Sequence, residues 1–210
     1  GLDLMPHVLS SMTDNLEIND EYHFYKKIPE IFNYMLENKL IGRKGIGGFY
    51  KLENINGKKI KKSINLSTKD YFESKKPTID SLKIAKKDLS KFLEIDNIYS
   101  KYAWSVLSEV ILYTLNHTVE ISNDITSIDS AMKNGFGLQF GPFELIDKIG
   151  KSWIENKLLR ENKTVPTILK KLSEEKFYKV EEGKLQYFDF RENIFKNFDR
   201  PDGVLILSDI

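Results

Sequence analysis

The stretch from Asp129 to Gly150, DSAMKNGFGLQFGPFELIDKIG, constrains the fold of this chain more than any other. It combines a helix stop, a tight turn and a helix start. Gly141 and Pro142 predict the start of a helix, because a proline in the first turn loses no hydrogen bond and already has a helical φ. Glu144 suits that first turn, whose dipole favours an anion. The stretch therefore predicts a helix-loop-helix within a helical protein.

The limits of both helices can be predicted from single residues. The spacing of Thr126 and Asp129 predicts a capping box that opens the first helix, and Gly135 is expected at its left-handed C-terminal position. Gly137 supplies a second permissive backbone position. The second helix has apolar residues at every third position and a glycine at its end: Phe143, Ile146, Ile149 and Gly150.

Length and composition exclude several classes of protein. The chain has 210 residues, enough for one good core or two small ones, and a net charge of +1, which gives no overall field for nucleic acid or an anionic membrane. It has no cysteine, which excludes disulfides and cysteine-based zinc sites. No apolar run approaches the ~20 residues of a membrane span, and no signal peptide is recognisable. We expect a soluble, cytoplasmic protein without a membrane span.

Two parts of the chain resemble each other. Helical patterns that start at Pro29 and Pro166 each lead to Phe-Tyr-Lys, at residues 49–51 and again at 177–179. Asn56-Gly57 predicts a hairpin turn after the first Phe-Tyr-Lys, and Glu182-Gly183 occupies the matching place after the second. We infer an internal repeat with insertions in the first copy.

The repeat and the breaks in helical periodicity divide the chain into four segments. The predicted segments are a partial first helical copy at residues 1–62, a connector at 63–80, a second copy at 81–199 and a linker towards a further domain at 200–210. The longest predicted helix, residues 97–119, forms the spine of the second copy. Its predicted apolar stripe comprises Ile98, Tyr102, Val106, Val110 and Thr114, flanked by Leu107 and Ile111.

A further helix is predicted near the start of the chain, where four apolar residues share one face: Met5, Val8, Leu9 and Met12. Leaving this face in water would cost several kcal/mol, at about 25 cal/mol per Å² of apolar surface. We therefore expect it to be covered by the second copy or by another molecule.

The order D-x-A-M-K-x-G-F-G, followed by G-P-F-E-L-x-D-x-x-G, resembles the C-terminal helical domain of the 3-hydroxyacyl-CoA dehydrogenase family. The segment G-R-K-G-I-G-G-F-Y is similar to the element that closes this domain, although Gly45 stands where the family usually has a polar residue. The resemblance implies an all-α fold like the C-terminal domain of 6-phosphogluconate dehydrogenase, duplicated and with short β-hairpins. The family-motif positions, implied to be structural or near the acyl-CoA cleft, are Gly45, Gly47, Gly48, Phe49, Tyr50, Asp129, Gly135, Gly137, Gly141, Pro142, Phe143 and Asp147.

The resemblance also implies a function. The complete enzyme would oxidise (S)-3-hydroxyacyl-CoA to 3-ketoacyl-CoA with NAD in fatty-acid β-oxidation. NAD and the catalytic His and Glu would belong to an upstream Rossmann domain, so we carry over no catalytic, cofactor-binding or metal-binding residue to this chain and expect it to be inactive alone. A crotonase-like enoyl-CoA hydratase domain is expected downstream, and the helical copies would cap the acyl-CoA cleft and form a domain or subunit interface, with a homodimer as one arrangement.

Other interpretations stay open. The chain could be a non-catalytic all-helical interaction module, or belong to a related dehydrogenase of short 3-hydroxy acids. Glycines 42–48 lead into a strand-like run rather than a helix, which favours a hairpin approach over a phosphate loop. Asp129, Glu144 and Asp147 form the densest carboxylate group, in which capping competes with an acid-base pair as the explanation.

Overall fold

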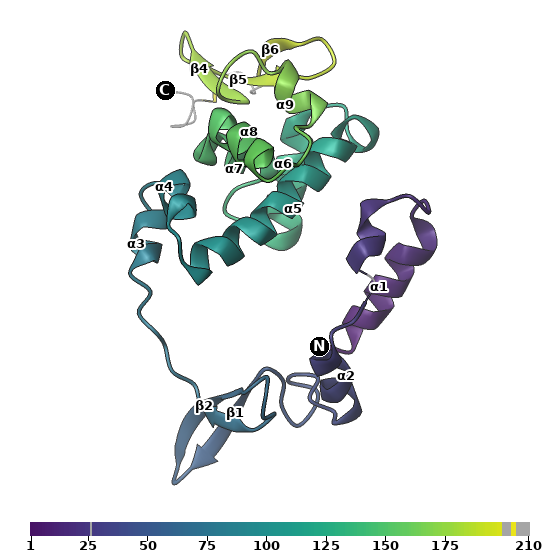
Figure 1. Cartoon of the computed structure of the whole chain (residues 1–210), viewed down its shortest axis with the longest axis vertical. Coiled ribbons are helices and arrows are strands. Elements are labelled where there is room, and N and C mark those ends of the chain that lie inside the picture. The colour runs from purple at the N-terminus through teal and green to yellow at the C-terminus, as the bar shows by residue number, and fades with distance from the viewer. Residues whose placement is uncertain (26, 199–202, 205–210) are drawn as a thin grey trace. The chain divides into compact units, whose positions relative to one another are not determined.

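The computed structural model describes residues 1–25, 27–198 and 203–204, and the chain forms two units, Gly1–Thr78 and Ile79–Ile210 (Figure 1). Each unit contains a three-stranded antiparallel sheet, in the order β1-β2-β3 and β4-β5-β6. The mostly helical fold with short β-hairpins that the sequence predicts is confirmed. The predicted linker, residues 200–210, lies outside the described residues except for Gly203 and Val204.

The first unit has a small core. Its elements are α1 (Leu4–Asn15), the 3-10 helix η1 (Glu21–Tyr25), α2 (Glu30–Glu37), β1 (Tyr50–Ile55), β2 (Lys58–Ile64) and β3 (Tyr71–Glu73). Pro29 occupies the N-cap position of α2, and the predicted turn at Asn56-Gly57 has φ values of 51° and 78° that fit a two-residue hairpin. Met35, Leu40 and Ile64 are buried together, whereas α1 buries no residue.

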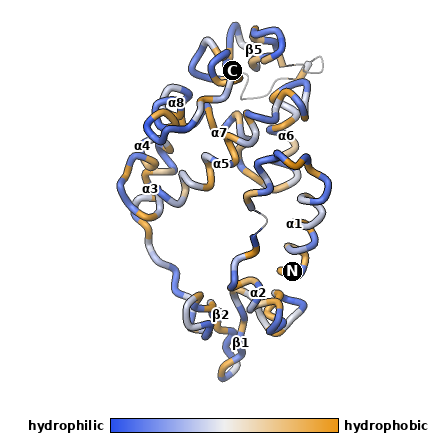
Figure 2. The backbone as a smooth tube through the Cα atoms, turned by 45° about the vertical axis from the view of Figure 1, so that its right-hand side comes forward, coloured by the Kyte–Doolittle hydropathy of each residue, from blue (hydrophilic) through white to orange (hydrophobic). Residues whose placement is uncertain are grey.

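The second unit holds the larger core. Its elements are α3 (Ser81–Ala85), α4 (Leu89–Glu94), α5 (Ile98–Ile121), α6 (Ile125–Phe136), α7 (Pro142–Ile149), α8 (Lys151–Arg160), α9 (Thr167–Lys171), β4 (Tyr178–Glu181), β5 (Lys184–Asp189) and β6 (Ile194–Asn197). Figure 2 shows apolar stretches along α5 and α7. Phe143 and Ile146 are completely buried and Ile149 is 3% exposed, so the apolar face predicted for α7 is confirmed.

The long helix lies where the sequence predicts it, but the predicted stripe is only partly buried. The Asn97 side chain accepts hydrogen bonds from the amides of Tyr99 and Ser100 and so starts α5. Ile98 and Tyr102 are 75% and 71% exposed. A strict four-residue spacing rotates by about 40° per step on a helix of 3.6 residues per turn, so the predicted stripe leaves the core. The buried face instead comprises Ser100, Trp104, Ser108, Ile111, Thr114, Leu115 and Thr118.

The third strand of each sheet was not predicted. Residues 63–80 are more than a connector, because they contain the end of β2 and all of β3, which pairs with β2. Only three residues long, β3 has too short a pattern to be recognised in the sequence. Within the described residues, no helix combines the length and apolar character of a membrane span.

Candidate functional site

The helix-loop-helix of the family motif is formed by α6 and α7, but α6 is capped differently from the prediction. Asp124, not Thr126, precedes the helix, and its carboxylate accepts from the Ser127 amide at 2.7 Å. The predicted capping box of Thr126 and Asp129 is therefore wrong, because Asp124 provides the N-cap two residues earlier. The Asp129 side chain is thereby free to bond elsewhere.

The end of α6 also differs from the prediction. Gly137 is the left-handed residue, with φ of 66°, whereas Gly135 lies inside the last turn of the helix. The helix extends this far because Gly135 can keep a helical conformation and only Gly137 needs a positive φ. The assignment of Gly135 to the C-terminal position is therefore wrong by two residues.

Asp129 caps α7 from the neighbouring helix. Its two carboxylate oxygens accept from the Phe143 and Glu144 amides at 2.9 and 3.1 Å. Gly141 stands at the N-cap of α7, and a Cβ there would overlap Asp129, so a glycine is required. Glu144 in turn accepts from the Gly141 amide at 2.9 Å. Together these bonds form a capping box in which another helix provides the capping side chain.

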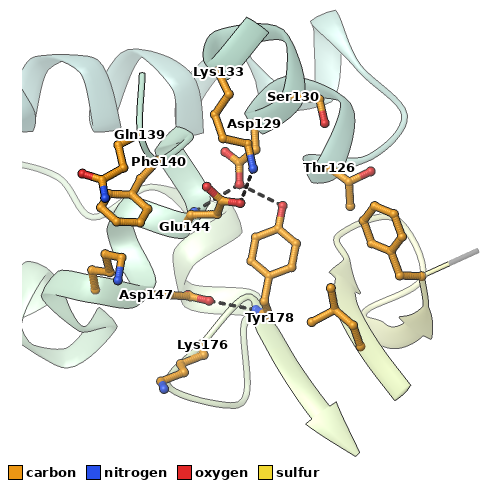
Figure 3. Close-up of a pocket in the computed structure, with 13 residues that line it drawn as sticks. Thr126, Asp129, Ser130, Lys133, Gln139, Phe140, Glu144, Asp147, Lys176 and Tyr178 are labelled. Atoms are coloured by element: carbon orange, nitrogen blue, oxygen red, sulfur yellow. Dashed lines mark hydrogen bonds and ion pairs between the residues drawn. The ribbon is translucent and has the colours of Figure 1, made fainter. Parts of the chain in front are cut away.

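The same carboxylates fasten the second sheet to the helices (Figure 3). The Tyr178 hydroxyl donates to Asp129 at 2.8 Å, and Asp147 accepts from the Phe177 and Tyr178 amides at 2.6 and 2.9 Å. Glu144 also forms an ion pair with Lys133 of α6. We call Asp129, Glu144, Asp147 and Tyr178 the carboxylate clasp, since these residues join α6, α7 and β4.

Burial sets the electrostatics of the clasp. Desolvation raises the pKa of Asp129 to about 6 and that of Asp147 to about 7, against the opposing effect of the backbone amides that bond them. Desolvation and the neighbouring Asp129 also raise the pKa of Tyr178. Each oxygen of both aspartates accepts from a fixed protein donor, so the geometry supports capping rather than an acid-base pair.

A hollow of ≈570 Å³ lies beside the clasp. The Lys148 ammonium lies 4.2 Å from the centre of the Phe140 ring, and Lys133 is neutralised by Glu144. Among the described residues, no group of three potential His, Cys, Asp or Glu ligands is placed to hold a metal ion. The hollow thus combines apolar, cationic and acidic side chains, the acidic ones being those of the clasp. Its further lining includes Thr126, Ser130, Gln139, Lys176, Leu185 and Phe198.

The other predicted motif positions lie in the first unit and are not part of the clasp. Gly47 and Gly48 are buried, and the Gly47 carbonyl accepts from the Gly42 amide at 2.6 Å. A Cβ on Gly48 would come within 3.1 Å of the Gly42 backbone, and one on Gly45 would overlap the Lys39 carbonyl. These glycines permit close backbone approach ahead of β1, as expected for a hairpin approach rather than a phosphate loop.

The sequence prediction missed the parts of the clasp that lie outside the helix-loop-helix. In the sequence Tyr178 stands out only as part of the repeated Phe-Tyr-Lys. Asp147 belongs to the motif, but its bonds to the Phe177 and Tyr178 amides span about 30 residues of chain. The repetition of Phe-Tyr-Lys was the available signal for Tyr178, but a repeat does not identify the residue that this tyrosine contacts.

The comparisons with known proteins agree with this geometry. The model of the 3-hydroxyacyl-CoA dehydrogenase C-terminal domain matches residues 103–187, which include α6, α7 and most of the hairpin β4–β5. No solved structure matches the chain.

Three relatives are similar over much of the chain. A Bacillus subtilis protein named as a 3-hydroxyacyl-CoA dehydrogenase is 34% identical over 197 residues, 90% of this chain and 24% of the relative. Proteins of Rickettsia prowazekii and Rickettsia felis, named as fatty acid oxidation complex trifunctional enzymes, are 36% and 37% identical over 146 and 147 residues. Each of these two matches covers 70% of this chain and 20% of the relative. The chain thus spans only a fifth to a quarter of the length of these relatives.

Proposed function

The chain belongs to the 3-hydroxyacyl-CoA dehydrogenase family through its C-terminal domain, and on this premise we propose that it acts as the helical region of a longer enzyme of fatty-acid β-oxidation. The reaction of that enzyme is the oxidation of (S)-3-hydroxyacyl-CoA to 3-ketoacyl-CoA with NAD. The observation that carries the proposal is the clasp, in which the family-motif residues Asp129, Gly141 and Asp147 hold α6, α7 and β4 in one arrangement.

The role proposed for this region is to shape the enzyme rather than to react. The carboxylates of Asp129 and Asp147 are fully engaged by protein donors, and the motif glycines allow close packing. NAD and the reacting acid-base groups belong, in this proposal, to a separate Rossmann domain. The helical region caps the acyl-CoA cleft and contributes a domain or subunit interface. We also propose that the full-length enzyme contains a crotonase-like domain and is located in the cytoplasm.

A chimera tests this function. The matching segment of the Bacillus subtilis relative is replaced by this chain, and NADH formation from (S)-3-hydroxybutyryl-CoA is followed by absorbance. We expect the chimera to oxidise the substrate, and a chimera with Asp129→Ala to lose activity together with thermal stability. A folded but inactive chimera, alongside an active parent protein, would refute the proposal.

A further inference from the structure

The sheets β1–β3 and β4–β6 have the same strand order and matching pairs of residues. The strand pairings correspond as follows: Tyr50 with Ser63 and Ile64 with Tyr71 in the first sheet, Tyr178 with Tyr187 and Phe188 with Phe195 in the second. The carbonyl of Phe49 accepts from the second strand at 3.0 Å, and the carbonyl of Phe177 does so at 2.8 Å. Phe49 and Tyr50 are therefore the structural equivalents of Phe177 and Tyr178.

The turns and side chains agree with this correspondence. Asn65 accepts from the amides two and three residues later at 2.9 and 3.0 Å, and Asp189 does the same at 2.8 and 3.1 Å. Each turn closes on a residue with positive φ, Lys69 at 67° and Asn193 at 58°. Two lysines also cover equivalent rings: Lys51 over Tyr71 at 4.4 Å and Lys179 over Phe195 at 4.2 Å.

In the second sheet, residues of α7 cover the outer edge of the first strand, β4. At the start of β4 the amides of Phe177 and Tyr178 donate to Asp147 of α7. The ring of Phe143, also on α7, lies 4.8 Å from that of Phe177, which is completely buried. Phe143 and Asp147 are four residues apart and so share one face of the helix.

The same edge of the first sheet is covered differently, because the Phe49 ring lies 5.6 Å from that of Phe32 on α2. Among the described residues, no side chain accepts from the amides of Phe49 and Tyr50 in the way that Asp147 does in the second unit, and Tyr50 is 57% exposed. The edge borders a hollow of ≈390 Å³ whose lining includes Arg43 and Lys61 but no acidic residue. Outward amides beside cationic side chains suit a carboxylate.

We propose that the β1 edge of the first unit binds a helical polypeptide segment that carries a phenylalanine and an aspartate four residues apart, F-x-x-x-D. The aspartate accepts from the Phe49 and Tyr50 amides, as Asp147 does in the second unit. The phenylalanine covers Phe49, and a second carboxylate from the same segment accepts from the Tyr50 hydroxyl, as Asp129 accepts from Tyr178. The segment that binds this edge thus has the same three contact groups that α6 and α7 supply in the second unit, namely a phenylalanine, an aspartate and a second carboxylate.

Amide NMR of the whole chain tests this proposal. The probe is a synthetic peptide of residues 124–150, which contains F-E-L-I-D, titrated into ¹⁵N-labelled protein. We expect saturable downfield shifts of the Phe49 and Tyr50 amides. A peptide with Asp147→Ala should bind about tenfold more weakly, because it lacks the charged acceptor. In the protein, Tyr50→Phe should weaken binding, whereas the matched variant Tyr178→Phe should not.

Other outcomes would overturn the proposal. Unchanged Phe49 and Tyr50 amides, or equal affinity for the Asp147→Ala peptide, would show that the edge does not select an aspartate. Shifts confined to Phe177 and Tyr178 would mean that the peptide only displaces α7 in the second unit. If the Phe49 and Tyr50 amides shift with protein concentration in the absence of peptide, and shift equally in the Asp147→Ala protein, a second copy covers the edge without its aspartate and the proposal is overturned.

Discussion

The buried aspartates of the clasp should make the second unit less stable at pH 8 than at pH 5. Their pKa values rise from 3.8 to about 6 for Asp129 and about 7 for Asp147. A raised pKa in the folded state contributes stability that is fully present below the unfolded pKa and is lost as the pH rises through the folded pKa. The second unit should therefore lose stability as the pH rises from about 4 to about 8.

The magnitude follows from these shifts. One pKa unit corresponds to about 1.4 kcal/mol, so the two aspartates together lower the free energy of unfolding by about 4 kcal/mol between pH 5 and pH 8. Asp147 accounts for about two thirds of this, because its pKa is higher. The half-buried Asp88 does not titrate in this window, because hydrogen bonds from Lys91 and Ser90 lower its pKa to about 2.

Urea unfolding monitored by tryptophan fluorescence is the suitable assay. The chain has two tryptophans, Trp104 and Trp153, and both lie in the second unit with ring centres 5.1 Å apart. The measurement is made in a His117→Asn background, which removes the histidine of that unit. Asp147→Asn should reduce the pH-dependent change to about 1.5 kcal/mol. Stability that rises from pH 5 to pH 8, or an unchanged pH dependence in Asp147→Asn, would refute the reasoning.

Four further predictions concern packing, bonding, cofactor and assembly. Gly141→Ala should lower the free energy of unfolding by about 2 kcal/mol or more, because the added Cβ overlaps Asp129. In the matched control Gly135→Ala, the added Cβ meets no atom within 4 Å, so thermal melting should show an unchanged or higher stability. Tyr178→Phe should cost about 1–3 kcal/mol in urea unfolding, because it removes a bond to a buried carboxylate; a change within error would contradict this bond. The chain alone should show no saturable NADH fluorescence change, and micromolar binding would overturn the assignment of NAD to another domain. Val8 is 54% exposed on α1 and belongs to the apolar face that we expect to be covered. The double variant Val8→Ser, Leu9→Ser should lower the melting temperature or the mass measured by light scattering, because it removes apolar surface from that contact. If neither quantity changes, the face is solvated.

The sequence by itself determined the local structure of the chain. Gly141-Pro142 predicted the start of α7, and Asn56-Gly57 and Glu182-Gly183 predicted the two hairpin turns. These signals succeed because φ preferences and missing donors act within a few residues and need no tertiary partner. The family resemblance of the segment from Asp129 to Gly150 was also evident from residue order alone.

Only the tertiary structure decided what the motif residues do. Asp129 looked like a cap for its own helix, yet it caps α7, and Asp147 holds the start of β4. The buried face of α5 likewise depended on which helices pack against it, because both sides of that helix carry apolar residues. A side chain's partner across 14 to 49 residues of chain, as for Asp129 with Phe143 and Tyr178, is set by packing and not by local preference, so no sequence pattern could specify it.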